Sequence, residues 1–283
     1  MSAKDYGTIS PSAKSLLLMK GYTAIPYAKE TAALLQGPEV FGIDFDDKDF
    51  WFWMRVVHFE SRYRSIDQLL KETEASRILE LSSGYSFRGL DRCNRDEQLH
   101  YIDTDLPEVI AIKQKMIAQL QVPAPKGRYE LLPLNVMDRA QFQQIISRFS
   151  DGPLAIVNEG LLMYLDKEEK TQLCRTIHDT LVQRGGCWIT ADVYVRNMRA
   201  TLPQSQPESE FFRQHHIEEN KFDSYEAARE FFRSNGFEVV KEAVPDYPSL
   251  SALPHLLKVL PEEARNSKEP PPKVQATWML KAV

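Results

Sequence analysis

Two residues, Gly84 and Asp105, have the types and the spacing of a nucleoside-binding pair. Gly84 follows a short apolar run of the chain, and Asp105, 21 residues later, closes the next such run. A glycine after a strand lets the backbone approach a ligand closely, and an acidic residue about 20 positions further on can bind ribose hydroxyls. The alternative for the same residues is an ordinary strand, turn and helix with a solvated aspartate.

The turn lacks two of the glycines that a dinucleotide pyrophosphate needs. The glycine positions of the G-x-G-x-x-G pattern hold Ser82, Gly84 and Phe87, which disfavours close approach of a pyrophosphate. S-adenosylmethionine has no phosphate. It needs one glycine beside its methionine part, an acid for the ribose, a polar group for the adenine, a cation for its carboxylate and acceptors for its ammonium. The sequence offers each of these, so it favours this cofactor over a nicotinamide dinucleotide.

The elements that must position these residues alternate between strands and helices. Short apolar runs predict strands at 77–81, 98–103, 129–134, 153–158, 187–192, 237–240 and 276–280. Periodic segments predict helices at 11–20, 26–36, 46–71, 107–120, 166–183 and 224–236. Such alternation is typical of βαβ units. We therefore expect an α/β fold with a Rossmann-like, mostly parallel seven-stranded sheet, helices on both faces, and ligands at the carboxyl ends of the strands.

We expect one domain over residues 1–283. Its parts are N-terminal helices (1–75), a cofactor-binding core (76–192), a polar lid insertion (193–222), and a C-terminal helix and strands (223–283). The aromatic cluster Trp51-Phe52-Trp53-Met54 is expected in the core. Glu269-Pro270-Pro271-Pro272 is expected to be an exposed, extended connection.

The composition argues against several classes of protein. The 283 residues are 43% hydrophobic and carry 35 Lys and Arg against 40 Asp and Glu, a net charge of −5. This acidity argues against a nucleic-acid or membrane-surface partner, and no apolar run is long enough to span a bilayer. The start of the chain has no secretory pattern. Cys93, Cys174 and Cys187, without CxxC spacing, fit free thiols, so we expect a cytoplasmic protein and no metal site.

Six sequence blocks within residues 10–192 resemble, in order, the leucine carboxyl methyltransferase family, which includes bacterial polyketide-type O-methyltransferases. The blocks are Ser12-Ala13-Lys14, Gly21-Tyr22 with Ile25-Pro26-Tyr27, Arg62-Tyr63-Arg64-Ser65-Ile66-Asp67, Leu81-Ser82-Ser83-Gly84, Asp103-Thr104-Asp105-Leu106-Pro107 and Glu159-Gly160-Leu161-Leu162-Met163-Tyr164-Leu165. The last block is the most specific. The resemblance implies a class I methyltransferase that uses S-adenosyl-L-methionine and releases S-adenosyl-L-homocysteine. Three positions depart from the family pattern: Ser82 replaces a glycine, and Ser86 and Asn135 stand where aspartate is usual.

The resemblance also implies roles in cofactor binding for eight residues. Lys14 and Arg62 would bind the methionine carboxylate, and Glu159 would accept from the ammonium. Gly84 would admit the methionine part, Asp105 would take the ribose hydroxyls with Asp103 as a companion, and Asn135 and Val136 would flank the adenine.

Each of these roles has a structural alternative. Lys14 also fits a surface lysine, and Arg62 also fits an ion pair with Glu60 or Asp67 on its own helix. Glu159 could instead cap the helix that starts near Asp166. The catalytic residue is not identified by the sequence; Tyr164 is a weak candidate, since a tyrosine in such a position is more often a packed aromatic side chain.

The reaction expected from such a site is methyl transfer to an oxygen of a small-molecule acceptor. A carboxylate acceptor is ionised at neutral pH and needs no base, whereas a hydroxyl acceptor needs one. Neither His178 nor the pair His215-His216 is a compelling base. The alternatives are methylation of a protein's C-terminal leucine, and a non-catalytic module that only binds the cofactor.

Overall fold

One mostly parallel sheet forms the centre of the protein. The structure is a computed structural model that describes residues 6–35, 41–196, 204–266 and 273–283. Within them, seven strands lie in the order β3-β2-β1-β4-β5-β7-β6. The strands are β1 (Arg77–Leu81), β2 (His100–Asp105), β3 (Arg128–Pro133), β4 (Leu154–Asn158), β5 (Gly186–Tyr194), β6 (Phe237–Glu242) and β7 (Gln275–Ala282). β1 to β5 are parallel, and β7 runs antiparallel to both of its neighbours. The predicted fold class is confirmed.

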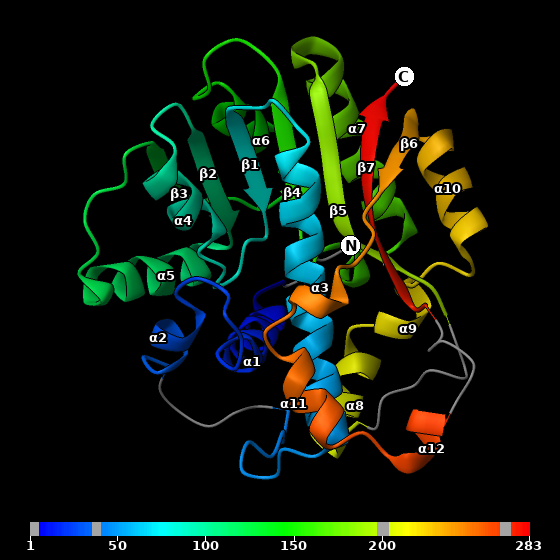
Figure 1. Ribbon diagram of the computed structural model, residues 1–283. Helices are drawn as coiled ribbons and strands as arrows, with labels where there is room; N and C mark the ends of the chain where they lie inside the picture. Colours follow the sequence, from blue (N-terminus) through cyan, green and yellow to red (C-terminus); the bar gives the residue numbers. More distant parts are fainter. Residues whose placement is uncertain (1–5, 36–40, 197–203, 267–272) are drawn as a thin grey trace.

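Helices cover both faces of this sheet (Figure 1). They are α1 (Ser10–Lys20), α2 (Ala28–Ala32), α3 (Phe50–Lys71), α4 (Arg88–Arg95), α5 (Pro107–Leu120), α6 (Arg139–Ile146), α7 (Lys167–Arg184), α8 (Gln206–Gln214), α9 (Ile217–Asn220), α10 (Tyr225–Ser234), α11 (Leu253–Lys258) and α12 (Glu262–Asn266). α6, α7 and α10 bury one apolar layer against the strands. α3 and α4 bury the layer on the opposite face. The hydrophobic pattern did not predict the short helices α4, α6, α8, α9, α11 and α12.

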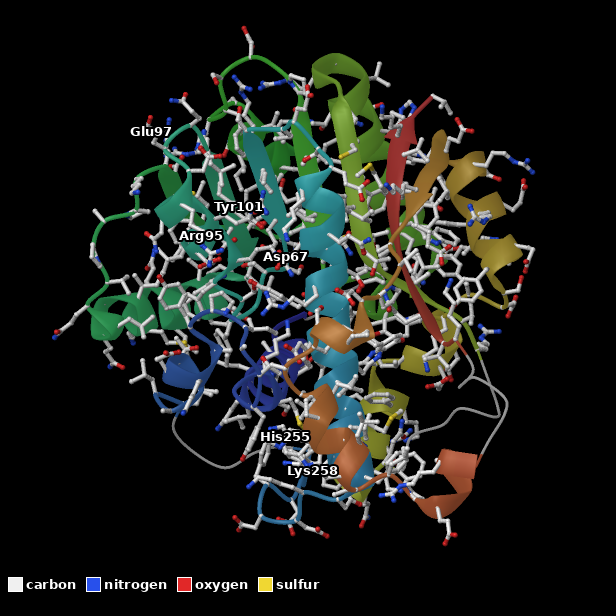
Figure 2. The ribbon with its side chains drawn as sticks, in the orientation of Figure 1. Asp67, Arg95, Glu97, Tyr101, His255 and Lys258 are labelled. Atoms are coloured by element: carbon white, nitrogen blue, oxygen red, sulfur yellow. The ribbon has the colours of Figure 1, made fainter. Side chains whose placement is uncertain are left out.

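The long helix α3 connects the sheet to the N-terminal part. The Asp49 side chain caps it by accepting from the amide of Phe52 at 2.8 Å. Phe52 and Trp53 are buried as predicted, whereas Trp51 is 40% exposed. Figure 2 shows His255 and Lys258 on α11 beside the end of α3, and the His255 ring stacks on Trp53 with 4.4 Å between centroids. α3 therefore packs on several elements at once.

The predicted lid insertion, 193–222, starts inside β5, which continues to Tyr194. Val195 bridges to Phe222, and the segment between them contains α8 and α9. α7 ends at Arg184, one residue beyond the predicted range 166–183, and Gly185 leaves the helix with a φ of +70°. Glu269-Pro270-Pro271-Pro272 lies outside the described residues. No helix in the described part of the chain is long and apolar enough to cross a membrane.

Candidate active site

A cavity of about 320 Å³ lies at the carboxyl ends of the parallel strands. The sheet order reverses between β1 and β4, where ligands of such folds bind. Seven residues singled out in the sequence line this cavity: Arg62, Gly84, Asp105, Asn135, Val136, Glu159 and Tyr164. The structure thus brings together residues that are spread over a hundred positions of the chain.

Gly84 and Asp105 lie together in the lining of the cavity. The Gly84 amide donates to Asp105 Oδ2 and the Leu106 amide to Oδ1, each at 2.7 Å. Gly84 has a φ of +51°, a conformation that favours glycine. Each carboxylate oxygen can accept two hydrogen bonds, so Asp105 keeps capacity for two further donors. Removal from bulk water raises the pKa of Asp105 to about 6, against the lowering by its two amide donors.

Ser82 shares the left-handed conformation of this turn. Its φ is +49°, where a side chain costs about 1–2 kcal/mol relative to ordinary backbone. Ser82 therefore replaces the family's glycine at a position where the backbone keeps a conformation that favours glycine.

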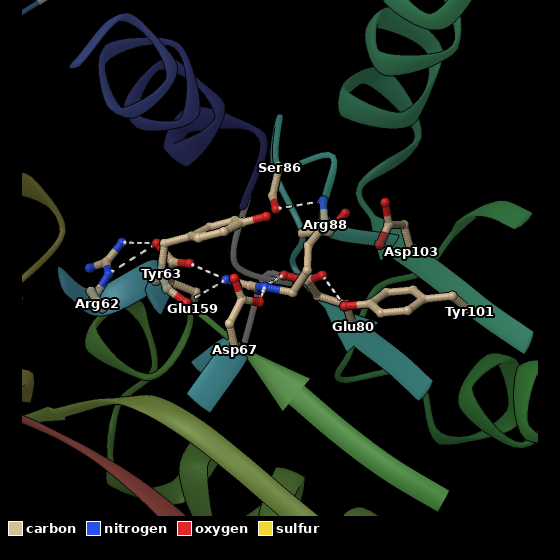
Figure 3. A network of polar contacts seen from close by, with 12 residues as sticks. Arg62, Tyr63, Asp67, Glu80, Ser86, Arg88, Tyr101, Asp103 and Glu159 are labelled. Carbon is tan, nitrogen blue, oxygen red and sulfur yellow. Dashed lines mark hydrogen bonds and ion pairs between the residues drawn. The ribbon is translucent and has the colours of Figure 1, made fainter. Parts of the chain in front are cut away.

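The Glu159 carboxylate lies among three buried cations. Figure 3 shows two of them, Arg62 and Arg88, beside Glu159. Oε1 accepts from Lys20 Nζ at 2.6 Å and Arg62 Nε at 3.2 Å, and Oε2 accepts from Arg88 Nη2 at 3.1 Å. Burial opposes ionisation, but the three cations hold the pKa of Glu159 well below its usual value. One acceptor site of Oε2 remains for a ligand ammonium.

Arg88 connects this cluster to the sheet. Its guanidinium also contacts Glu80 at 2.7 Å and Asp67 at 3.0 Å. Glu80 in turn accepts from the Tyr101 hydroxyl at 2.5 Å. Figure 3 shows these side chains converging from α3, β1, β2 and α4. The cluster helps to fix where the Glu159 carboxylate lies, because Arg62 is also held by the Tyr194 hydroxyl and Arg88 by Glu80 and Asp67.

The alternatives raised for Arg62 and Glu159 differ from what the structure shows. Arg62 contacts Glu159 and the Tyr194 hydroxyl rather than Glu60 or Asp67. Glu60 instead accepts from the backbone amides of Ser251 and Ala252. The helix after Glu159 is capped by the side chain of Asp166 within a capping box.

The structure does not bring Lys14 or Asp103 into the lining of the cavity. Lys14 lies half-buried on α1, and Lys20, at the end of the same helix, lies beside Arg62 and Glu159. Asp103 is fully buried and accepts from Lys113 Nζ at 2.7 Å and the Tyr129 hydroxyl at 2.5 Å. Lys113 also donates to the Ser83 hydroxyl at 3.0 Å. Through Lys113, Asp103 is therefore linked to Ser83 in the turn that follows β1.

Asn135 and Val136 follow β3 at the edge of the cavity. The Asn135 side-chain oxygen accepts from the Met137 amide at 3.0 Å, which holds the loop in a tight turn. This hydrogen bond fixes the orientation of the Asn135 side chain, including its Nδ2 amino group. Val136, the next residue, is buried.

Asp192 holds the loop that carries Glu159 and Tyr164. Its carboxylate accepts from the amides of Gly160 at 2.6 Å, Leu161 at 2.7 Å and Leu162 at 3.1 Å. Asp192 was not predicted from the sequence, where its one signal is an acidic residue inside a buried strand. Tyr164 lines the cavity, and removal from water raises its pKa to about 12, so it is a neutral phenol at pH 7.

The end of the cavity away from Asp105 is formed by α3, α8 and residues 41–43. His58 Nε2 lies 2.9 Å from the Tyr194 hydroxyl, which accepts from Arg62 Nη1 at 2.8 Å. Desolvation, aided by the Arg62 cation, lowers the pKa of His58 to about 3. Sequence reasoning missed His58, Tyr194 and Lys20, because contacts between distant segments decide their places. In the described residues no cluster of His, Cys, Asp and Glu could hold a metal ion.

Comparison with known proteins identifies a family and solved structures of similar fold. The family model described as leucine carboxyl methyltransferase matches residues 33–178. Leucine carboxyl methyltransferase 1 of Kluyveromyces lactis is 33% identical over 93 residues, which span 32% of this chain and a quarter of that protein. A DUF574 family protein of Streptomyces avermitilis has a TM-score of 0.56 at 14% identity, over 95% of this chain and 97% of that one. Magnesium protoporphyrin IX methyltransferase of Synechocystis PCC 6803, solved with bound SAH, has a TM-score of 0.48 at 8% identity, over 95% and 100%.

Proposed function

The chain belongs to the leucine carboxyl methyltransferase family, and on that premise we propose that it is an S-adenosylmethionine-dependent O-methyltransferase. Its acceptor in this proposal is a carboxylate or hydroxyl of a small molecule. The observation that carries the proposal is the Gly84–Asp105 pair, joined at 2.7 Å in a cavity that six of the eight expected cofactor residues line.

The residues of the cavity fit the parts of the cofactor. Asp105 has free acceptor capacity for the ribose, and Asn135 and Val136 lie where the adenine would be flanked. Arg62 and Lys20 supply the positive charge for a carboxylate, while Glu159 retains one acceptor site for the ammonium. Charge-assisted bonds of this kind give both affinity and orientation.

The bound cofactor would supply an electrophilic methyl group on a positively charged sulfur. The chain then has to orient the acceptor oxygen and exclude water, and orientation is a large part of the catalysis of such displacements. Tyr164 can donate a hydrogen bond but is not a base at neutral pH. His58 lies in the same cavity, but its pKa of about 3 makes it a weak base, and its Nε2 atom already contacts the Tyr194 hydroxyl.

Thermal shift and calorimetry with S-adenosylmethionine, S-adenosylhomocysteine and NAD test the proposal. Either adenosyl-sulfur compound at 100 times its Kd should stabilise the protein by about 2.7 kcal/mol, and NAD should not. The stabilisation should disappear in Asp105→Ala and persist in Asp138→Ala, since Asp138 caps α6 outside the cavity. Stabilisation by NAD alone, or no response to either adenosyl compound, would overturn the proposal.

A further inference from the structure

Lys113 is a fully buried lysine of α5 whose partners connect it to the turn that follows β1. Its Nζ atom donates to Asp103 Oδ2 at 2.7 Å and to the Ser83 hydroxyl at 3.0 Å. The helix that carries it packs against β2 and β3 (Figure 1). A lysine is almost never fully buried unless it is paired, so the contact with Asp103 is what allows Lys113 this place.

The pair is poorly suited to a role in stability alone. Both side chains are 0% exposed, and taking two charges out of water has a cost that a buried pair often fails to recover. Asp103 Oδ2 also accepts from the Tyr129 hydroxyl at 2.5 Å, whereas Oδ1 has no hydrogen-bond partner among the described residues. An unpaired buried acceptor adds a further cost. A cluster that is costly to bury and adjoins the cofactor turn points to a role in that turn.

Hydrogen bonds connect Lys113 to the position of Asp105. Ser83 accepts from Lys113 through its hydroxyl and donates its amide to the Thr104 carbonyl of β2 at 2.8 Å. The next residue, Gly84, donates its amide to Asp105 Oδ2 at 2.7 Å. Lys113 therefore holds the residue that directly precedes the one that orients the Asp105 carboxylate.

The charge of Lys113 also acts on Asp105. Burial raises the pKa of Asp105, and among the nearby charged side chains Lys113 lowers this pKa and Glu108 of the same helix raises it. The other titratable groups that face these residues are Asp103, Glu80, Tyr85, Tyr101 and Tyr129. Burial raises the pKa of each of the three tyrosines, so they are neutral from pH 5 to 8. Glu80 is paired with Arg88 at 2.7 Å.

We propose that Lys113 is a positioning residue for the cofactor, which holds the Ser83-Gly84 turn from inside the protein and favours the ionised Asp105 carboxylate that takes the ribose hydroxyls. The inference rests on the proposed function and extends it with a residue that does not line the cavity. Lys113 acts through its bond to Ser83 and through its charge.

Calorimetry with S-adenosylhomocysteine from pH 5 to 8 tests this inference. At pH 8, Lys113→Met should bind at least about threefold more weakly than the wild type, because the turn loses a charge-assisted bond. The ratio of the two affinities should grow about threefold further towards pH 5, since Asp105 without the cation takes up its proton at higher pH. The matched control Lys115→Met removes an exposed lysine of the same helix and should follow the wild type at every pH.

The variant Ser83→Ala separates the bond from the charge. It removes the contact with the turn but leaves Lys113 beside Asp103, so it should weaken binding by a similar factor at every pH. Wild-type affinity in Lys113→Met overturns the inference. A loss in Lys113→Met that does not grow towards pH 5 also overturns it, because a merely structural role would give that result.

The double variant Lys113→Met/Asp103→Asn keeps the test open where the single variant does not fold, since it leaves no uncompensated charge. It also removes the titration of Asp103 itself. The ratio to the wild type should grow towards pH 5 as in the single variant, and a constant ratio overturns the inference. Absence of S-adenosylhomocysteine binding by the wild type overturns the proposed function instead.

Discussion

The backbone amide of Gly84 donates directly to the Asp105 carboxylate at 2.7 Å, across the ends of the neighbouring strands β1 and β2. This bond places the carboxylate before any ligand arrives, because the Leu106 amide holds its other oxygen. The ribose hydroxyls would then meet an acceptor that is already oriented. The same contact links the conformation of the turn to the ionisation of Asp105.

Cofactor affinity should therefore depend on pH through Asp105. Its pKa of about 6 lies above the ordinary value because the group is withdrawn from water. The ionised form accepts from the ribose, so the affinity for S-adenosylhomocysteine should be constant above pH 7 and fall up to about tenfold per unit below pH 6. Calorimetry from pH 5 to 8 measures this. Asp105→Asn should bind more weakly with a flatter profile, and an unchanged profile in that variant would assign the pH dependence to another group.

Replacing Asp192 with alanine should loosen the loop that carries Glu159 and Tyr164. Three successive backbone amides, from Gly160 to Leu162, would lose their acceptor. Each buried donor left unsatisfied costs about 1–3 kcal/mol, so we expect a loss of at least about 3 kcal/mol of unfolding free energy and weaker S-adenosylhomocysteine binding.

Denaturant unfolding measures the effect of Asp192→Ala on stability. The control is Asp179→Ala, an exposed aspartate that pairs with Arg139 outside the cavity. An exposed pair contributes about 0.2–1 kcal/mol. Equal losses in the two variants would show that Asp192 does not hold the loop.

Ser82→Gly should stabilise the protein. Ser82 has a φ of +49°, and relief of about 1–2 kcal/mol of backbone strain exceeds the entropy of about 1 kcal/mol that a glycine loses on folding. The melting temperature should rise by roughly 2 °C, the shift expected for a net gain below 1 kcal/mol. Gln121→Gly is the matched control at the end of α5, with a φ of +51°.

The two glycine variants should differ in cofactor binding. Ser82 lines the cavity and Gln121 does not. Ser82→Gly should keep or increase the affinity for S-adenosylhomocysteine, whereas Gln121→Gly should leave it unchanged. A lower melting temperature in Ser82→Gly would mean that the serine side chain stabilises the turn more than its conformation strains it.

The sequence predicted the sheet well because its strands are continuous apolar runs with clear ends. β1 (77–81) and α5 (107–120) have the predicted bounds, since local pattern and turn residues specify both. Gly84 and Asp105 were also predictable as site residues, because each follows or closes a strand whose end is clear in the local sequence pattern. Asp192 and Lys20 escaped prediction because their partners lie about 30 and 140 residues away. Local spacing carries no information about such contacts.

The family resemblance and the structure point to different lysines as the cation for a ligand carboxylate. The family resemblance assigns this role to Lys14, but Lys20 is the lysine of α1 that lines the cavity, 2.6 Å from Glu159. Lys20→Met should weaken S-adenosylhomocysteine binding about tenfold, as expected for the loss of one charge-assisted bond. Lys14→Met should change it less than about twofold, because the side chain is not part of the cavity lining. Calorimetry on both variants decides between them. A larger loss of affinity in Lys14→Met would show that Lys14 binds the ligand carboxylate. Helix α1 would then have to rotate when the ligand binds.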